Sequence, residues 1–218
     1  RTTLGFFGGL GARVLFLRDL KRALAEPDTY LPLIVRQMRA IGVDSVPLVV
    51  MVAAFIGGVI AIQVRYQLFP GIQLSIVGLS SRQITVLETG PLLTGLVLAG
   101  RVGAKMTAEI GTMRVTEQID ALETLAYDPV AYLVVPRLIA AVLMLPVLVL
   151  MADVIGVLSG AGAAVFVAGV KMSDFRDGVR LGYGHFQVAY SLIKATLFGG
   201  AIAYLCTYCL LYTSDAAD

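Results

Sequence analysis

Four long apolar runs alternate along the chain with shorter segments that carry most of the charge. They lie at residues 46–62, 84–100, 138–170 and 186–211. A helix needs roughly 17–25 residues to cross a bilayer core, so the first, second and fourth runs suit one span each. The sequence lacks the alternating ten-residue pattern of a membrane barrel, and a helix satisfies its own backbone in lipid. The pattern therefore predicts transmembrane helices.

The third run has a different length from the others. It is too long for one upright span and too short for two, which favours one long or tilted helix bent around Gly156, Gly160 and Gly162. Composition agrees: 58% of residues are hydrophobic, 15% are charged, and the mean hydropathy is +0.85. Soluble domains have about 45–50% apolar and about 25% charged residues. We expect an all-α integral membrane protein, a helical bundle of about four spans.

The basic residues predict the orientation of these spans. Seven of the 17 Lys and Arg residues precede residue 46, two separate the first two runs, four lie in 101–137 and three in 171–180. Because cytoplasmic loops are enriched in Lys and Arg, we place the N-terminus and the 101–137 segment in the cytoplasm. The basic residues and the lack of an evident transit peptide favour a bacterial cytoplasmic (inner) membrane, crossed several times.

Residues 1–44 precede the first span. Apolar and basic side chains are interleaved between residues 4 and 25, which indicates an amphipathic helix lying in the membrane interface. A short soluble helix that caps the bundle is the alternative. A signal peptide is disfavoured, because the basic residues follow the apolar ones and no small-residue cleavage site is evident.

A polar helical segment at residues 101–130 lies between strongly apolar ones. A helix can begin near Thr116, whose hydroxyl suits an N-cap, with Glu117 and Asp120 in the first turn, and end before Pro129. Apolar and acidic side chains fall on opposite faces of this helix. The pattern leaves two functions open: docking into a groove on a partner, or packing under the bundle.

Charged residues inside the runs are the candidates for mechanism. Ionisable groups in a membrane are costly and usually face a bundle interior or a wet cavity, which applies to Glu88, Asp153 and Lys194. For Glu88 and Lys194 the alternative is snorkelling to the membrane surface. For Asp153 we favour a hydrogen bond between helices.

A family resemblance adds to this interpretation. Residues 100–137, GRVGAKMTAEIGTMRVTEQIDALETLAYDPVAYLVVPR, resemble the signature of MlaE-type ABC transporter permeases, and the similarity extends over residues 41–206. The resemblance implies a permease domain at 45–211 that belongs to a lipid transporter. It also implies that the polar segment is a coupling helix, which contacts an ATPase subunit through Arg114, Glu117, Asp120 and Glu123.

The resemblance also implies a lipid site. Glu88 matches the acid of the family's R-E-L-G-P pattern and Lys194 matches the lysine of its I-K-S pattern, both near a lipid cavity between two permease copies. Gln63 and Tyr66 would line the same pocket, although Tyr66 also suits an interfacial anchor.

The chain departs from the family pattern next to Glu88. Leu87 and Thr89 stand where the family has Arg and Leu. A cationic contact to a headgroup is then either missing or supplied by Arg65 or Arg82.

The resemblance implies several partners. These are a second copy of the chain, an ABC ATPase, an MCE-domain substrate-binding protein, a small STAS-type accessory subunit and membrane lipids, with no nucleic acid. The sequence has no G-x-x-x-x-G-K-[ST] phosphate loop, so ATP and Mg are expected on the ATPase, and we expect no catalytic residue, cofactor or metal in this chain.

We therefore expect a phospholipid permease subunit, with a non-conducting membrane scaffold for an MCE complex as the alternative. An ion or proton carrier is disfavoured by the apolar surroundings of the three charges. Family members have five spans, so we interpret residues 212–218 as the result of truncation or as an artefactual tail.

Overall fold

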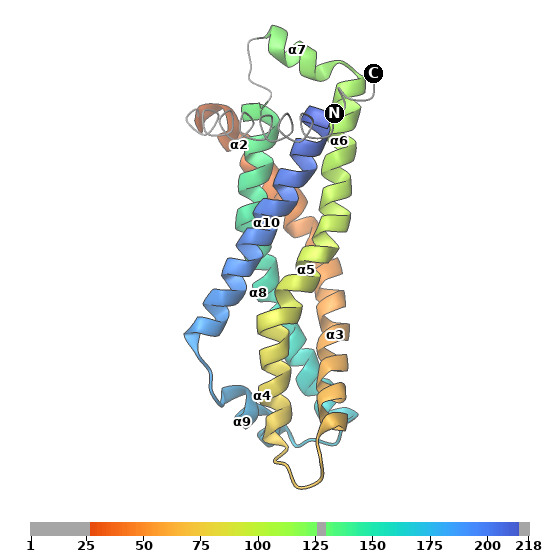
Figure 1. Ribbon diagram of the computed structural model, residues 1–218, viewed down its shortest axis with the longest axis vertical. Helices are drawn as coiled ribbons and strands as arrows, with labels where there is room; N and C mark the ends of the chain where they lie inside the picture. Colours follow the sequence, from red (N-terminus) through yellow and green to blue (C-terminus); the bar gives the residue numbers. More distant parts are fainter. Residues whose placement is uncertain (1–26, 126–129, 214–218) are drawn as a thin grey trace, which may run out of the picture.

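A computed structural model describes residues 27–125 and 130–213, in which every regular element is helical. The predicted interfacial helix at residues 4–25 lies outside these ranges. The long elements pack side by side into an elongated bundle (Figure 1). They are α2 (Pro27–Ile41), α3 (Val46–Gln67), α4 (Ser75–Ile84), α5 (Gly90–Leu98), α6 (Ala104–Val115), α8 (Val135–Phe166) and α10 (His185–Thr213).

Four helical stretches are long and apolar enough to cross a membrane. They are Pro32–Gln67, Ser75–Val115, Tyr132–Phe166 and His185–Thr207. The predicted all-α membrane fold with four spans is thereby confirmed. The third run forms a single helix, α8, of 32 residues with Pro146 inside it, as its length predicted.

The second span is longer than the apolar run that predicted it. Two π-helical segments, η2 (Thr85–Thr89) and η3 (Ala99–Gly103), join α4, α5 and α6 into one stretch. Polar residues after Gly100 therefore continue the span, where the sequence suggested the start of a loop. A helix that projects beyond the apolar core needs no apolar side chains, so hydropathy alone underestimates its length.

Close contacts between glycines hold α3 against α8. A Cβ atom on Gly57 would collide with the backbone of Gly156, and one on Gly160 would lie 3.1 Å from the Gly57 carbonyl oxygen. Such small residues allow helix backbones to approach in a membrane. A Cβ atom on Gly156 would also lie 2.9 Å from the Thr85 methyl group, so α3, α8 and η2 meet at this point. Gly162, by contrast, faces open space.

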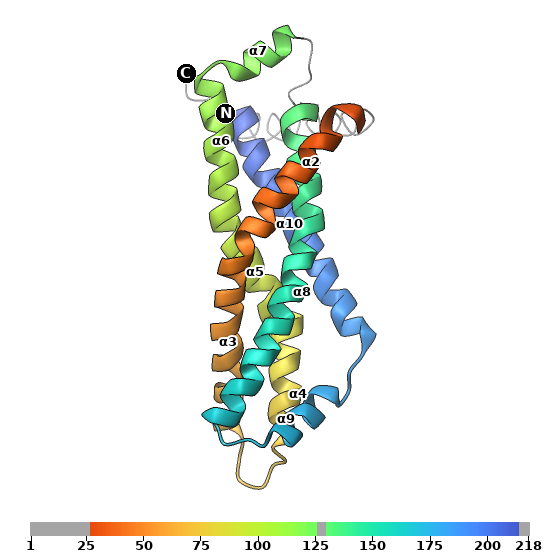
Figure 2. The same ribbon diagram turned by 180° about the vertical axis from the view of Figure 1, so that it is seen from behind.

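Two short helices lie at opposite ends of the bundle (Figures 1 and 2). At one end, α9 (Met172–Arg180) packs against α4, because Gly78 and Gly178 allow each backbone to touch the other. At the other end, α7 (Gln118–Thr124) follows α6.

The predicted N-cap of the helix at the α7 end is wrong. The Thr116 hydroxyl donates to the Thr112 carbonyl, at 2.8 Å, within the end of α6. Glu117 then adopts a left-handed φ of 55°, and α7 begins only at Gln118. A threonine hydroxyl can bond the preceding turn as well as the following one, and here the preceding helix offers the carbonyl.

Candidate functional site

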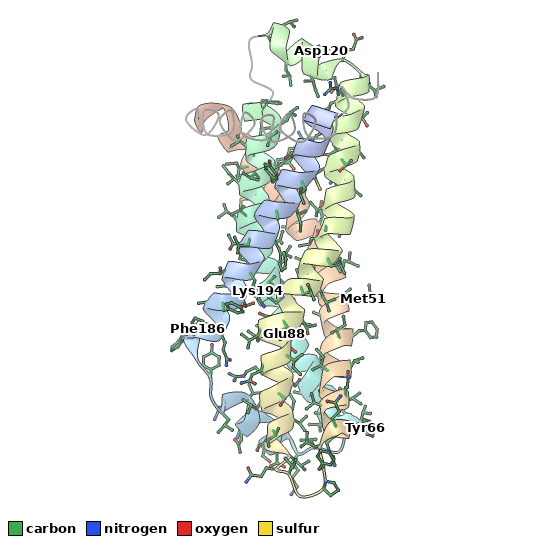
Figure 3. The ribbon with its side chains drawn as sticks, viewed as in Figure 1. Met51, Tyr66, Glu88, Asp120, Phe186 and Lys194 are labelled. Atoms are coloured by element: carbon green, nitrogen blue, oxygen red, sulfur yellow. The ribbon has the colours of Figure 1, made fainter. Side chains whose placement is uncertain are left out.

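Glu88 and Lys194 lie close together about midway along the bundle (Figure 3). Lys194 is on α10, and its Nζ donates a 2.8 Å hydrogen bond to the Leu87 carbonyl in η2. The same Nζ lies 4.5 Å from the centre of the Tyr190 ring, a cation–π distance. We call Leu87, Glu88, Tyr190 and Lys194 the η2–α10 site.

Pro91 removes one competing donor to the Leu87 carbonyl. In an α-helix the N–H of residue 91 would donate to the carbonyl of residue 87, but proline has no N–H. The ammonium group that α10 brings to this carbonyl therefore meets no donor from residue 91. A lysine at a helix centre in a bilayer costs about 2.5–3.5 kcal/mol on insertion scales, and the carbonyl and the ring offset part of this cost.

Glu88 remains without such compensation. Its side chain is exposed, and it forms no hydrogen bond or ion pair within the described part of the chain. An acid and a base thus lie side by side in the membrane without neutralising each other. Both remain available to a polar group that approaches from outside the bundle.

An apolar stripe on α5 follows Glu88 along the same helical stretch. Leu92 and Leu96 follow at helical spacing and are 57% and 68% exposed. A second stripe follows α3 through Met51, Phe55 and Val59, each more than half exposed. Such extended apolar surfaces face lipid or another membrane protein.

The space between these two helices is nearly filled. A cavity of only about 20 Å³ remains between α3 and α5, where Val52, Ile56 and Leu93 pack. This volume holds about one water molecule. An acyl chain does not fit into this cavity, whereas both stripes are open to the surroundings of the bundle.

The other two predicted lipid-site residues lie elsewhere. Gln63 and Tyr66 are exposed near the C-terminal end of α3, with Tyr66 79% exposed. Figure 3 shows Tyr66 near the end of the bundle, whereas Glu88 and Lys194 lie midway. One chain therefore brings Glu88 and Lys194 together, but not Tyr66.

The sequence did not identify three residues that shape this region. Tyr190 lies one helical turn before Lys194, and this spacing was the available signal. Pro91 removes the N–H that would face the Leu87 carbonyl in an α-helix. Ser191 donates a 3.2 Å hydrogen bond to Asp153 Oδ2, which is the bond between helices that the sequence favoured for Asp153.

The charged residues that the resemblance assigned to a coupling role lie around the short helix α7. Arg114 lies in the last turn of α6, Glu117 lies between α6 and α7, and Asp120 lies in α7. Glu117 and Asp120 are exposed. Glu123 also belongs to α7, but its side chain is outside the described set.

One face of α7 is attached to the bundle. Ile119 is buried against Ile110 of α6 and Leu133, which precedes α8. Below it, a 3.1 Å ion pair joins Glu109 of α6 to the buried Arg137 of α8. The helix α7 therefore packs on the bundle through one face, which is one of the two alternatives from the sequence. Its other face exposes Asp120, and docking of this face on a partner stays a prediction.

Comparisons with known proteins agree on one family. The family model described as Permease MlaE matches residues 34–218. A protein of Rickettsia prowazekii named "Probable ABC transporter permease protein" is 40% identical over 99% of this chain and 83% of its own length. A Synechocystis protein with the same description is 39% identical, over 93% of this chain and 75% of its own. The "Intermembrane phospholipid transport system permease protein MlaE" of Haemophilus influenzae is 31% identical, over 94% and 83%.

Proposed function

This chain belongs to the MlaE permease family, and from that membership we propose that it is the membrane subunit of an ABC-type transporter of phospholipid. The Haemophilus relative is named for phospholipid transport between membranes. An apolar outer surface interrupted by Glu88 and Lys194 suits a ligand with acyl chains and a charged headgroup. No covalent chemistry is needed for this function.

Two copies of the chain would enclose the lipid. A single copy has room for about one water molecule between α3 and α5, so a cavity for acyl chains needs a second apolar face. The stripes on α3 and α5 provide such a face. Glu88 and Lys194 would contact the headgroup, and Gln63 and Tyr66 would line the cavity nearer the end of α3.

Energy would come from a separate ATPase subunit that carries ATP and Mg. Its contact would be α7, through Asp120, Glu117, Arg114 and Glu123. The helical stretch Ser75–Val115 is continuous from this contact to Glu88, and the Glu109–Arg137 ion pair connects it to α8. A displacement of α7 can therefore change the surroundings of the headgroup.

The remaining assignments follow from the family and from the charge pattern. An MCE-domain protein would exchange lipid with the permease, and a small STAS-type subunit would accompany the ATPase. Seven Lys and Arg residues before residue 46 favour a cytoplasmic N-terminus. The α7 end of the bundle then faces the cytoplasm of a bacterium, and the α9 end lies at the opposite surface of its inner membrane.

One observation carries the proposal: Glu88 and Lys194 lie together in the membrane without an ion pair, and Glu88 belongs to a helical stretch that continues to the α7 end of the bundle. Native mass spectrometry of the complex purified from membranes tests it. Two permease copies, an ATPase dimer and bound phospholipid would support the transporter. A lipid-free complex without an ATPase would contradict it and favour a scaffold.

A further inference from the structure

A second polar site opens on a different face of the bundle. A cleft of about 360 Å³ lies among α4, η2, α8 and the turn between α9 and α10. Its polar residues are Arg82, Asp153 and Tyr183, and the rest of its lining is apolar. We call it the Arg82 cleft.

Arg82 is almost completely buried in this cleft, with 3% of its surface exposed. Its Nη2 donates to the carbonyls of Leu181 and Gly182, at 3.3 and 3.4 Å, and its Cζ lies 5.5 Å from the Tyr183 ring centre. The turn that presents these carbonyls needs glycine, because Gly182 has a φ of +62°. The Nε and Nη1 groups of Arg82 have no acceptor.

Asp153 is buried to a similar degree, with 5% exposed. Ser191 donates to its Oδ2, whereas its Oδ1 has no donor. The carboxylate lies directly against Gly90, where a Cβ atom would collide with Oδ1. The position of the carboxylate is therefore set by packing, and Oδ1 is enclosed beside Gly90 without a donor.

The two charged groups line the same cleft but do not pair with each other. Arg82 bonds to the carbonyls of the turn after α9, and Asp153 bonds to Ser191 of α10. No ion pair between them occurs in the described structure. A ligand that satisfies both needs an anion and a cation.

The depth and the opening of the cleft suit a lipid. Arg82 lies seven residues into α4, roughly 10 Å from the start of that helix, near the end of the bundle that carries α9. At the opening, Val154 and Leu158 are 58% and 62% exposed. A headgroup can therefore enter the cleft while its acyl chains stay on the apolar surface.

We propose that the Arg82 cleft binds the headgroup of a zwitterionic, amine-bearing phospholipid, with the phosphate on Arg82 and the ammonium on Asp153. This inference rests on the proposed function, because it takes a membrane lipid as the ligand, but it concerns a separate site. A free phosphate, or an anionic lipid without an amine, would leave the Asp153 carboxylate buried without a cation, which is unfavourable in a membrane.

The test uses the full transporter complex, equilibrated with vesicles of either phosphatidylethanolamine or phosphatidylglycerol with matched chains. Lipid retention is read by native mass spectrometry. The wild-type complex should retain the ethanolamine lipid in preference to the glycerol lipid. Arg82→Gln and Asp153→Asn should each lower that retention about tenfold, the size of one lost charged hydrogen bond. Arg82→Lys keeps the charge and should retain more lipid than Arg82→Gln.

Two results would overturn the cleft as a lipid site without affecting the proposed function. One is unchanged retention of the ethanolamine lipid in Arg82→Gln and Asp153→Asn, and the other is equal retention of both lipids by the wild type. Glu88→Gln separates the two sites. If Glu88→Gln removes lipid and Arg82→Gln does not, the proposed function is supported and the lipid site in the cleft is contradicted. If the wild type retains neither lipid, the proposed function and the cleft site are both contradicted. Loss of the dimer in Arg82→Lys and Asp153→Asn, in place of loss of lipid, would assign the two residues to assembly and overturn the site.

Discussion

The η2–α10 site and the Arg82 cleft each contain one acidic and one basic side chain, but these side chains differ in exposure. At the η2–α10 site, Lys194 is half-buried and bonded to a carbonyl, and Glu88 is exposed. In the cleft, Arg82 and Asp153 are buried, and each keeps polar atoms without a partner. Exposed charges suit weak, short-lived contact with a headgroup that is being transferred. Buried groups in fixed positions suit a headgroup that is held.

The two sites share one piece of backbone. Arg82 lies just before the π-helical segment η2 and Glu88 lies within it. A π-helical turn rotates the residues that follow it relative to those before, and such turns often occur at functional sites. The segment η2 therefore helps to direct Arg82 towards α9 and Glu88 towards the outer face of α5.

The largest effect should come from a change that removes both sites together. Gly57→Leu places a side chain where α3 touches Gly156, and Gly156 in turn touches η2. We expect a loss of stability of about 3 kcal/mol, the upper part of the usual range for overpacking. Thermal unfolding of the purified complex in detergent measures it.

Gly162→Leu is the matched control for Gly57→Leu. It adds the same side chain to α8 at a position that faces open space, so the unfolding temperature should stay near that of the wild type. Equal unfolding temperatures for both variants would contradict the packing of α3 on α8.

A smaller effect, on ATP-dependent lipid transfer, should distinguish lipid binding from coupling to the ATPase. Asp120→Lys reverses an exposed charge on α7, and like charges across an interface are strongly unfavourable. ATP-dependent transfer of lipid should fall about tenfold, which corresponds to about 1.4 kcal/mol, while both sites retain lipid. Lipid transfer and lipid retention are measured on the same preparation.

Asp177→Lys makes the same charge reversal at an exposed position on α9, at the other end of the bundle. Its transfer rate should match the wild type. A similar loss of transfer in both variants would mean that α7 is not the specific contact with the ATPase.

The smallest effect concerns the cleft alone. Ser191→Ala removes the donor to Asp153 Oδ2, and the loss of one hydrogen bond should cost about 1 kcal/mol of stability. Ser159→Ala is the control, since its hydroxyl bonds only a carbonyl in its own helix, at 3.1 Å. Thermal unfolding compares the two, and equal midpoints would argue against a structural role for the Asp153–Ser191 bond.

Much of the fold could be predicted from the sequence, because lipid allows few solutions. Long apolar runs must form helices, and the length of the third run correctly predicted α8 as one helix. Charges within the runs directed attention to Glu88, Asp153 and Lys194, and the structure places Glu88 beside Lys194.

The features that could not be predicted depend on contacts between distant segments, which leave no pattern in the local sequence. Arg82 falls before an apolar run and looks like a loop residue, yet α9 and its following turn bury it. The sequence raised it only as a substitute cation near Glu88, whereas its bonds are to Leu181 and Gly182. Thr116 had two possible hydrogen-bond acceptors, and only the path of the chain after α6 decides between them.

Transfer of labelled phospholipid between proteoliposomes and acceptor vesicles tests the central claim most directly. The complex should transfer lipid when ATP is added, and the double variant Glu88→Gln, Lys194→Met should lose this transfer while it still assembles with the ATPase. Wild-type transfer by the double variant would remove Glu88 and Lys194 from the mechanism. An assembled wild-type complex that hydrolyses ATP without moving lipid would contradict the permease function itself.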